Sequence, residues 1–361
     1  MVDTNIEHFR RQPIEQNWPA DDLEYLGACP VCGSCKRQIK YDGLRDKTYF
    51  SAPGEWKSWR CDNCAVVYLD PRPTRASIGH AYKSYYTHER KQKNFLKRIL
   101  YTIEVGIRHS YLNKKMGYKL KRALPFGWIY YLFSPSQKST IRNIIRDLPS
   151  PTQHRTRLLD VGCGDGEFLS IARSMGYEVE GLEIDPVAQD VAAKDGMIVH
   201  LGTLPGSELP ANYFDHITLN HVLEHFHDPC SALEEVFLLL KSHGRVWIQI
   251  PNIDALSLHR FGSNSRLLEP PRHLVMFGAS SLKSVLEKVG FQDVELLVPA
   301  RLKDHNYVFN QSWMIEQDLD PSITPTSVVP SEIKSMSTAM YQSHASKYEN
   351  AEIITMIGIK R

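Results

Sequence analysis

Three sets of residues in this chain have types and spacings that could do chemistry, and the first is a glycine-rich loop. The loop follows an aspartate that ends a short apolar run, and its members are Asp160, Gly162, Gly164 and Gly166. Glycine carries no Cβ, so a ligand can come close to such a backbone. A dinucleotide fingerprint would require a glycine at position 167, where Glu167 would instead face the pyrophosphate. The spacing therefore disfavours a dinucleotide.

A second carboxylate, Glu183, ends the next strand-like run, where it can accept both hydroxyls of a ribose lying across the loop. With the aspartate and the G-x-G-x-G loop, it resembles the first motif of class I methyltransferases that use S-adenosyl-L-methionine. That cofactor has a sulfonium cation and no phosphate, so acidic neighbours suit it. The resemblance implies further cofactor contacts from Ile184, Asn220, Thr203 and Leu204. Thr203 stands where the family commonly has an acidic residue, so the adenine contact is expected from the backbone or from Leu204.

The second set is a pair of C-x-x-C knuckles, formed by Cys29 with Cys32 and by Cys61 with Cys64. Two such pairs supply the four thiolates of a tetrahedral zinc site, which a small module needs to hold its core. A closed four-cysteine site leaves no open coordination position, so the predicted zinc is structural. Cys35 is a spare thiol that could replace Cys32 as a ligand.

The third set consists of histidines that follow two of the predicted strands. Methyl transfer to a hydroxyl requires removal of its proton, and the candidates for this general base are His225 and His273. Arg272, beside His273, could hold a phosphate or a carboxylate. His221, Glu224 and His225 also have a spacing that could hold a divalent ion, as in metal-assisted quinone methyltransferases.

The elements that position these residues alternate between strands and helices. Apolar runs predict strands at 158–161, 197–200, 214–219, 245–250, 291–298 and 351–360, with a further strand ending at Glu183. Helical patterns separate them at 167–175, 187–194, 230–241 and 280–290. This alternation predicts an α/β fold, a Rossmann-like doubly wound sheet whose ligand lies at the carboxyl ends of its strands.

The chain divides into four predicted parts. They are an N-terminal tail at 1–28, a zinc-ribbon-like module at 29–90, a basic helical connector at 91–150, and a cofactor-binding methyltransferase domain at 151–361 with insertions at 251–280 and 300–350. Residues 155–295 are similar to a broad bacterial family of small-molecule and glycan methyltransferases. Residues 29–88 resemble the zinc module of relatives in surface-polysaccharide and natural-product gene clusters. Tyr82, Tyr85 and Tyr86 in that module could line a substrate groove or pack it onto its neighbour.

Positive charge is concentrated in the connector. Residues 91–150 hold 13 Lys and Arg against Glu104 and Asp147, a net of +11 (13 − 2) in a chain whose whole net charge is +2. Apolar residues recur at helical spacing among these cations. Such a segment suits an anionic partner. This partner could be an acceptor linked to a phosphate carrier or a membrane surface that the chain touches peripherally. A nucleic acid is the less favoured alternative. A solvated linker helix is the structural alternative.

We therefore expect a methyltransferase that methylates a hydroxyl of a sugar, a surface glycan or a natural-product-like small molecule, with a histidine base. The alternatives are a zinc-finger-bearing RNA methyltransferase, a metal-assisted quinone-type O-methyltransferase, a sugar C-methyltransferase and a non-catalytic cofactor-binding scaffold. A methylase of nucleic-acid amino groups would carry Asn-Pro-Pro-Tyr after the fourth strand, where this chain has Asn-His-Val-Leu. The first residues lack the layout of a signal peptide, so a cytoplasmic location is expected.

Overall fold

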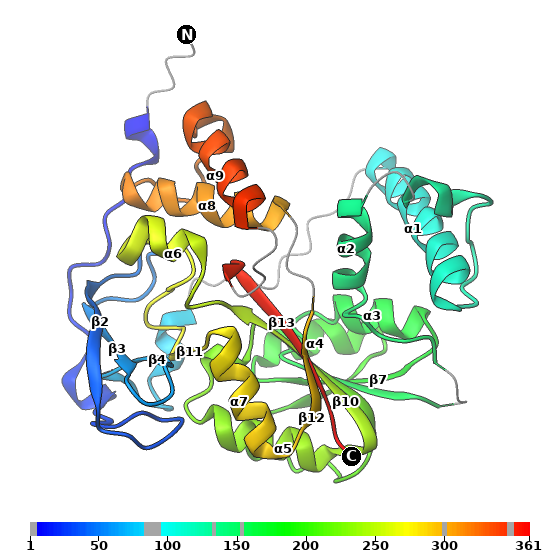
Figure 1. The fold of residues 1–361 in the computed structure, drawn as a ribbon, viewed down its shortest axis with the longest axis horizontal. Helices are drawn as coiled ribbons and strands as arrows, with labels where there is room; N and C mark the ends of the chain where they lie inside the picture. Colours follow the sequence, from blue (N-terminus) through cyan, green and yellow to red (C-terminus); the bar gives the residue numbers. More distant parts are fainter. Residues whose placement is uncertain (1–5, 83–94, 132–134, 152–154, 298–301, 345–349) are drawn as a thin grey trace.

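The computed structural model describes residues 6–82, 95–131, 135–151, 155–297, 302–344 and 350–361. Its centre is a mixed sheet of seven strands in the order β12-β13-β10-β9-β6-β7-β8 (Figure 1). The strands are β6 (Arg157–Val161), β7 (Glu178–Glu183), β8 (Ile198–Leu201), β9 (Phe214–Asn220), β10 (Leu240–Pro251), β12 (Gln292–Leu296) and β13 (Ile353–Ile359). Each lies within a few residues of its predicted range.

Strands β8, β7, β6, β9 and β10 run parallel, and β13 lies antiparallel between β10 and β12. Their carboxyl ends bring the glycine loop after β6, Glu183 at the end of β7 and Asn220 at the end of β9 to one edge of the sheet. The predicted Rossmann-like fold is confirmed.

Helices cover both faces of this sheet. Side chains alternate along a strand, so neighbours such as Leu158 and Leu159 belong to different cores. Leu158 packs in one cluster with residues of α3 (Glu167–Ser174) and α4 (Pro186–Lys194). Leu159 packs in the larger cluster with residues of α5 (Pro229–Leu239) and α7 (Ala279–Val289).

The cysteine module forms a second, four-stranded sheet in the order β11-β4-β3-β2. Its strands are β2 (Arg37–Leu44), β3 (Trp56–Cys61), β4 (Val67–Leu69) and β11 (Val275–Met276). The first three come from the predicted zinc module, but β11 comes from the insertion that follows β10. Val275 pairs with Tyr68 and Met276 pairs with Val67, so the module and the methyltransferase domain share one sheet.

Residues 6–28 contain short elements that pack on the cysteine module. Within them lie the short helices η1 (Ile6–Phe9) and η2 (Ala20–Asp22) and the strand β1 (Leu23–Glu24), which pairs with β5 (Arg72–Pro73). Trp18 is buried and stacks edge-on against Trp56 of β3 at a centroid distance of 5.4 Å. The sequence showed no motif there, but this aromatic packing holds the segment onto the module.

The basic connector is helical, as predicted. It comprises α1 (Phe95–Met116), the short helix η4 (Gly127–Tyr131) and α2 (Pro135–Ile144). In Figure 1, α1 and η4 form a lobe at the edge of the molecule, and α2 leads from this lobe back to α3. Within the described residues, no helix is long and apolar enough to cross a lipid bilayer.

The two predicted insertions pack against each other. The first contains α6 (Leu256–Phe261), η6 (Gly262–Asn264) and β11, and the second contains α8 (Leu302–Glu316), η7 (Thr326–Val328) and α9 (Ser331–His344). Phe261 of α6 stacks edge-on against Phe309 of α8 at 4.7 Å between ring centroids. Helices η3 (Ile78–Tyr82) and η5 (Leu223–His225) complete the described elements.

Candidate active site

The glycine loop is shaped by contact on one side and open space on the other. All three glycines have left-handed backbones, with φ of 67° at Gly162, 54° at Gly164 and 78° at Gly166. A Cβ added to Gly162 would lie 2.5 Å from Cγ2 of Val222, whereas one added to Gly164 would meet nothing within 4 Å. Val222 therefore holds one end of the loop, and the backbone around Gly164 is the part that a ligand can approach.

Glu183 is fixed in place by backbone amides. Its Oε2 accepts from the amide of Gly164 at 2.8 Å, and its Oε1 accepts from the amides of Ile184 at 2.9 Å and Asp185 at 3.0 Å. A carboxylate has about four acceptor sites, so these three bonds leave acceptor capacity for a ribose hydroxyl. The carboxylate thus joins the loop to the end of β7 and fits its predicted role.

Asp160 is fully buried beneath the loop. Its Oδ1 is paired with the guanidinium of Arg146 and accepts from the Thr218 hydroxyl at 2.8 Å. Its Oδ2 is buried without a hydrogen-bond partner among the described residues. The side chain therefore links β6 to β9 and to Arg146, the second residue after α2. Only Oδ2 has acceptor capacity left for a ligand.

The other predicted cofactor residues lie along the same edge of the sheet. The side chain of Ile184 is exposed beside Glu183, and Asn220 ends β9 opposite Gln249. Thr203 is partly exposed, but Leu204 is buried in the larger core. Leu204 can accordingly offer only its backbone to an adenine ring.

The two candidate bases lie side by side. His225 and His273 have ring centroids 4.9 Å apart. His225 Nδ1 lies 2.9 Å from the carbonyl oxygen of Arg272, and His273 Nδ1 lies 2.7 Å from that of Leu267. A carbonyl oxygen only accepts, so each Nδ1 carries the hydrogen and donates it. Each Nε2 is then the nitrogen left for chemistry.

Glu224 lies where these nitrogens point. Its Oε1 is 4.0 Å from Nε2 of His225, 4.0 Å from Nε2 of His273 and 3.5 Å from Nδ1 of His221. Both of its carboxylate oxygens are fully buried and have no hydrogen-bond partner among the described residues. Burying a carboxylate without a hydrogen-bond donor costs free energy, and native structures rarely contain such a group.

Burial lowers the pKa of His225, and it lowers that of His273 well below the ordinary value of 6.5, with His225 adding to the effect. Both rings are therefore neutral near pH 7 and present lone pairs on Nε2. The two Nε2 lone pairs then converge on the side chain of Glu224. Glu224, His225 and His273 each offer one ligand atom, and these atoms all lie within 4.8 Å of one another. This donor set suits a divalent transition-metal ion.

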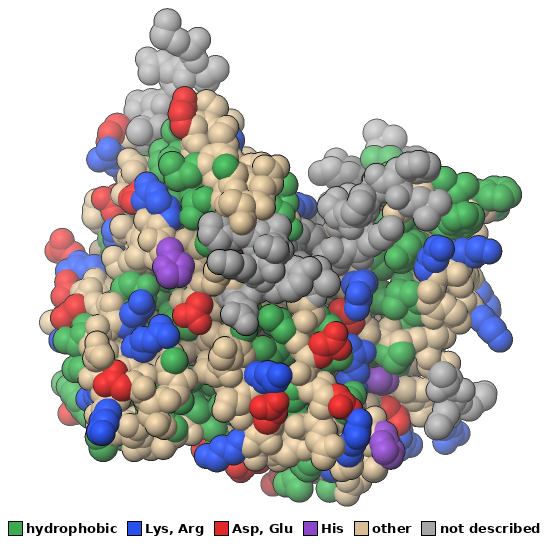
Figure 2. All heavy atoms as spheres, in the orientation of Figure 1, with side chains coloured by type: hydrophobic (Ala, Val, Ile, Leu, Met, Phe, Trp, Pro, Cys, Tyr) green, Lys and Arg blue, Asp and Glu red, His purple; other side chains and the backbone are tan. Residues whose placement is uncertain are grey.

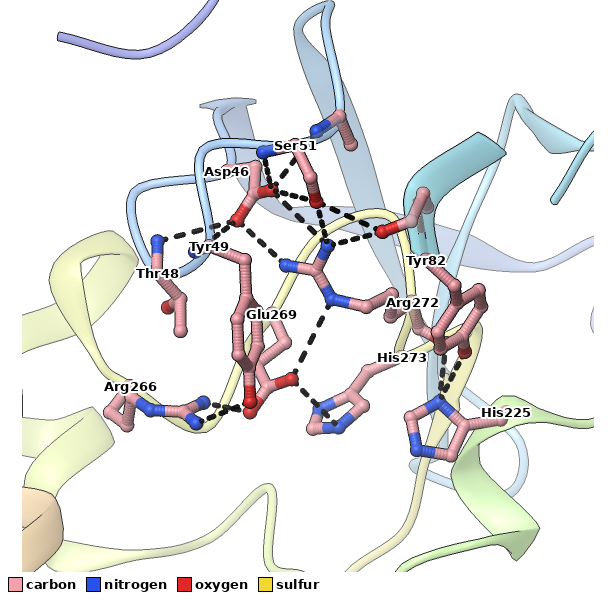
Figure 3. Close-up of polar contacts among 12 residues, drawn as sticks. Asp46, Thr48, Tyr49, Ser51, Tyr82, His225, Arg266, Glu269, Arg272 and His273 are labelled. Atoms are coloured by element: carbon pink, nitrogen blue, oxygen red, sulfur yellow. Dashed lines mark hydrogen bonds and ion pairs between the residues drawn. The ribbon is translucent and has the colours of Figure 1, made fainter. Parts of the chain in front are cut away.

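Arg272, which the sequence suggested could hold a phosphate or a carboxylate, pairs with a carboxylate of the chain itself. Figure 3 shows its guanidinium pointing away from the histidines into the cysteine module, where Nη2 lies 2.7 Å from Oδ1 of Asp46. Nη1 donates to Ser51 Oγ at 3.1 Å and to the carbonyl of Ala81 at 3.0 Å. The side chain is fully buried. An arginine in an irregular segment resembled an anion site, but its carboxylate comes from the chain itself.

Sequence reasoning missed Glu269 and Asp46 near the histidines, and it named Tyr82 without linking it to His225. The Tyr82 hydroxyl lies 3.1 Å from Nδ1 of His225, and Glu269 Oε2 lies 3.9 Å from Nε2 of His273 (Figure 3). Asp46 is connected to the histidines through Arg272, with which it forms an ion pair. The tyrosine cluster was a signal for Tyr82, which packs the module onto the domain; Tyr85 and Tyr86 lie outside the described residues.

The four predicted zinc ligands come together in the cysteine module. Cys29 and Cys64 have their sulfurs 3.5 Å apart, as do Cys32 and Cys61. Four sulfurs at about 2.3 Å from a tetrahedral zinc would be roughly 3.8 Å from one another. The thiols thus fit a structural zinc. Cys35 is exposed and does not belong to this cluster.

Residues 126–296 match a family model described as a methyltransferase domain. The ubiquinone biosynthesis O-methyltransferase of Schizosaccharomyces pombe is 31% identical over 99 residues, which are 25% of this chain and 36% of that protein. The enzyme of the same name from Haemophilus ducreyi is 27% identical over 157 residues, which are 40% of this chain and 61% of that protein. The chain thus spans less than two thirds of either relative.

Among solved structures, a SAM-dependent methyltransferase from Archaeoglobus fulgidus is 21% identical, covers 65% of this chain and all of its own length, and has a TM-score of 0.44. The family match assigns residues 126–296 to a methyltransferase domain. The residues predicted to bind the cofactor lie along the edge of the sheet described above.

Proposed function

We propose that this protein is an S-adenosylmethionine-dependent O-methyltransferase that activates its acceptor hydroxyl at Glu224, His225 and His273. The observation that carries the proposal is the buried carboxylate of Glu224, whose oxygens have no donor among the described residues although two neutral imidazoles point at it. A divalent cation would satisfy all three groups. We name these residues as its ligands.

The remaining donors nearby agree with such a centre. His221 is partly exposed, and its Nδ1 lies 3.5 Å from Glu224 Oε1, so it can complete the set from the solvent side. The Nδ1 atoms of His225 and His273 each donate to a backbone carbonyl, an arrangement that commonly orients histidine ligands.

Methyl transfer is an in-line displacement at the sulfonium carbon, so the acceptor oxygen must be deprotonated and aligned. A bound divalent cation would lower the pKa of a hydroxyl that coordinates it. Glu183 and the backbone at Gly164 hold the cofactor on the adjacent strand ends, and Val222 fixes the loop between the two sites.

For the acceptor we propose a phenolic ring of the quinone-precursor type. The curated relatives are named for O-methylation in ubiquinone biosynthesis, which supports this class. A phenol also has a lower pKa than a sugar hydroxyl, so the site has to contribute less to its deprotonation. The sugar or glycan acceptor expected from the sequence finds no support among these relatives.

A histidine base that acts without a metal is the second candidate mechanism. The contacts made by Nδ1 of His225 favour it. Its Nδ1 contacts both the Arg272 carbonyl and the Tyr82 hydroxyl, which fixes the ring with Nε2 unprotonated. In that case Nε2 would take the hydroxyl proton and Glu224 would stabilise the resulting imidazolium.

Metal analysis combined with an assay on phenolic acceptors separates the two mechanisms. We expect two metal ions per wild-type chain and one in Glu224→Gln, since the cysteine site is retained. Mild chelation should abolish turnover of the wild type, and added divalent cation should restore it. Full turnover after chelation, with a single metal per chain, would contradict the metal centre and leave the histidine base. No turnover of any phenol would contradict the acceptor class.

A further inference from the structure

The lobe formed by α1 and η4 exposes an unusual number of large apolar side chains. Eight of the exposed large hydrophobic residues in the described chain fall between residues 99 and 130. We call the group formed by six of them the connector surface, namely Leu100, Ile103, Leu124, Phe126, Ile129 and Tyr130. Phe126 is 74% exposed and Leu100 is 65% exposed. Figure 2 shows hydrophobic side chains on the surface of this lobe, at the upper right.

The connector surface is built by a loop and a helix that pack directly on each other. The amide of Leu124 donates to the carbonyl of Gly106 at 2.9 Å, one helical turn from Ile103. A Cβ added to Gly127 would lie 3.0 Å from Cα of Ile107, so η4 sits against the backbone of α1. The exposed residues of both segments therefore belong to one lobe and are not scattered singly over the molecule.

Exposed cations accompany this apolar surface. Lys114, Lys115, Lys119, Lys121 and Arg122 are all exposed, while Glu104 is the one acidic residue between positions 99 and 131. The ammonium groups of Lys114 and Lys115 lie 5.8 and 5.9 Å from the ring of Trp128 in η4. The positive charge is thus located on the same lobe as the apolar residues.

We propose that the connector surface binds the face of an anionic phospholipid bilayer. Apolar side chains of an interfacial helix enter the boundary between headgroups and acyl chains, and neighbouring cations attract anionic headgroups. An RNA would use the cations but would gain little from exposed aliphatic residues such as Leu100 and Ile103, because RNA-binding surfaces stack bases on aromatic or arginine planes. The apolar content of the lobe therefore favours a bilayer over RNA. This inference does not depend on the acceptor proposed above.

Cosedimentation with lipid vesicles tests the proposal on the full chain. We expect binding to vesicles of phosphatidylcholine mixed with phosphatidylglycerol, weak binding to phosphatidylcholine alone, and loss of binding at high salt. The double variant Leu100→Ser/Phe126→Ser should bind the anionic vesicles about tenfold less tightly or worse. Replacing Lys114, Lys115 and Lys119 by Gln should weaken binding by roughly fivefold for each cation removed.

A matched double variant on other surfaces controls for loss of exposed apolar area. Tyr25 is 75% exposed and Leu238 is 59% exposed, and Tyr25→Ser/Leu238→Ser should bind vesicles as the wild type does. All variants should keep the wild-type melting temperature and cofactor affinity, because the changed side chains are exposed. Equal binding to neutral and anionic vesicles, an equal loss in the control variant, or binding to a structured RNA without binding to vesicles would each overturn the proposal.

Discussion

Asp46 of the cysteine module and Arg272 of the methyltransferase domain form a doubly hydrogen-bonded ion pair in which both side chains are fully buried. Nη2 donates to Oδ1 at 2.7 Å and Nη1 donates to Oδ2 at 3.2 Å. The carbonyl of Arg272 in turn accepts from His225, and His273 is the next residue. The pair therefore joins the module to both His225 and His273.

Breaking this pair should destabilise the whole protein. Asp46→Asn leaves the guanidinium without its charged partner, and loss of one partner of a buried pair costs about 3–5 kcal/mol. Urea unfolding should show a free energy of unfolding lower by that amount, and hence a lower midpoint. Glu55→Gln, which removes the partner of Arg45 in an exposed pair, should change stability by about 0.5 kcal/mol or less. A midpoint unchanged by Asp46→Asn would show that the pair is dispensable.

The same pair predicts a pH dependence of stability. Burial by itself raises the pKa of Asp46, but Arg272 and the amides of Tyr49 and Ser51 outweigh it and hold the pKa below 3.8. A carboxyl whose pKa is depressed in the folded state contributes stability above its unfolded pKa and loses it as the pH falls through the folded pKa. The urea midpoint of the wild type should therefore fall more steeply below about pH 4 than that of Asp46→Asn. Parallel curves would contradict the assignment.

The fold class was largely predictable, because buried parallel strands appear as apolar runs and their alternation with helices indicates a parallel, doubly wound sheet. The glycine loop and Glu183 were predictable because both follow such runs directly. The contact of Asp46 with Arg272 and the pairing of β4 with β11 were not, since each joins residues far apart in the chain without any local pattern. Arg272 was misread for that reason.

The cofactor site predicts a selective effect at Glu183. Glu183→Gln keeps the shape of the side chain but removes the charge that accepts from Gly164 and Ile184. S-adenosylmethionine should bind at least about tenfold more weakly in calorimetry, since a hydrogen bond to a charged group contributes about 1.5–3 kcal/mol. Glu180→Gln, on the same strand and paired with His200, is the control and should bind normally. Equal affinities in the two variants would remove Glu183 from the ribose site.

The cysteine cluster predicts which thiol of the first knuckle binds zinc. Cys32→Ser should lower the zinc content and stability of the purified protein, because Cys32 belongs to the four-sulfur cluster. Cys35→Ser should keep one structural zinc, since Cys35 is exposed and outside that cluster. Metal analysis of both variants shows whether Cys32 or Cys35 is the zinc ligand. A full zinc content in Cys32→Ser together with a loss in Cys35→Ser would reverse the assignment.

Tyr82 predicts that the cysteine module takes part in catalysis. Its hydroxyl lies 3.1 Å from Nδ1 of His225, so Tyr82→Phe removes one of two groups that orient this ring. We expect a fall in kcat of roughly three- to tenfold, by analogy with the loss of one neutral hydrogen bond of about 1 kcal/mol, without a change in cofactor affinity.

The matched control for this prediction is Tyr41→Phe, which removes a phenolic hydroxyl from strand β2 of the same module, outside the site described above. It should keep the kcat of the wild type. Both variants should melt at the same temperature within a few degrees, because a single buried hydroxyl contributes little to global stability. If Tyr82→Phe keeps full kcat, or if it lowers cofactor affinity as much as kcat, then Tyr82 does not act through His225, and the module contributes to the site only by holding Arg272.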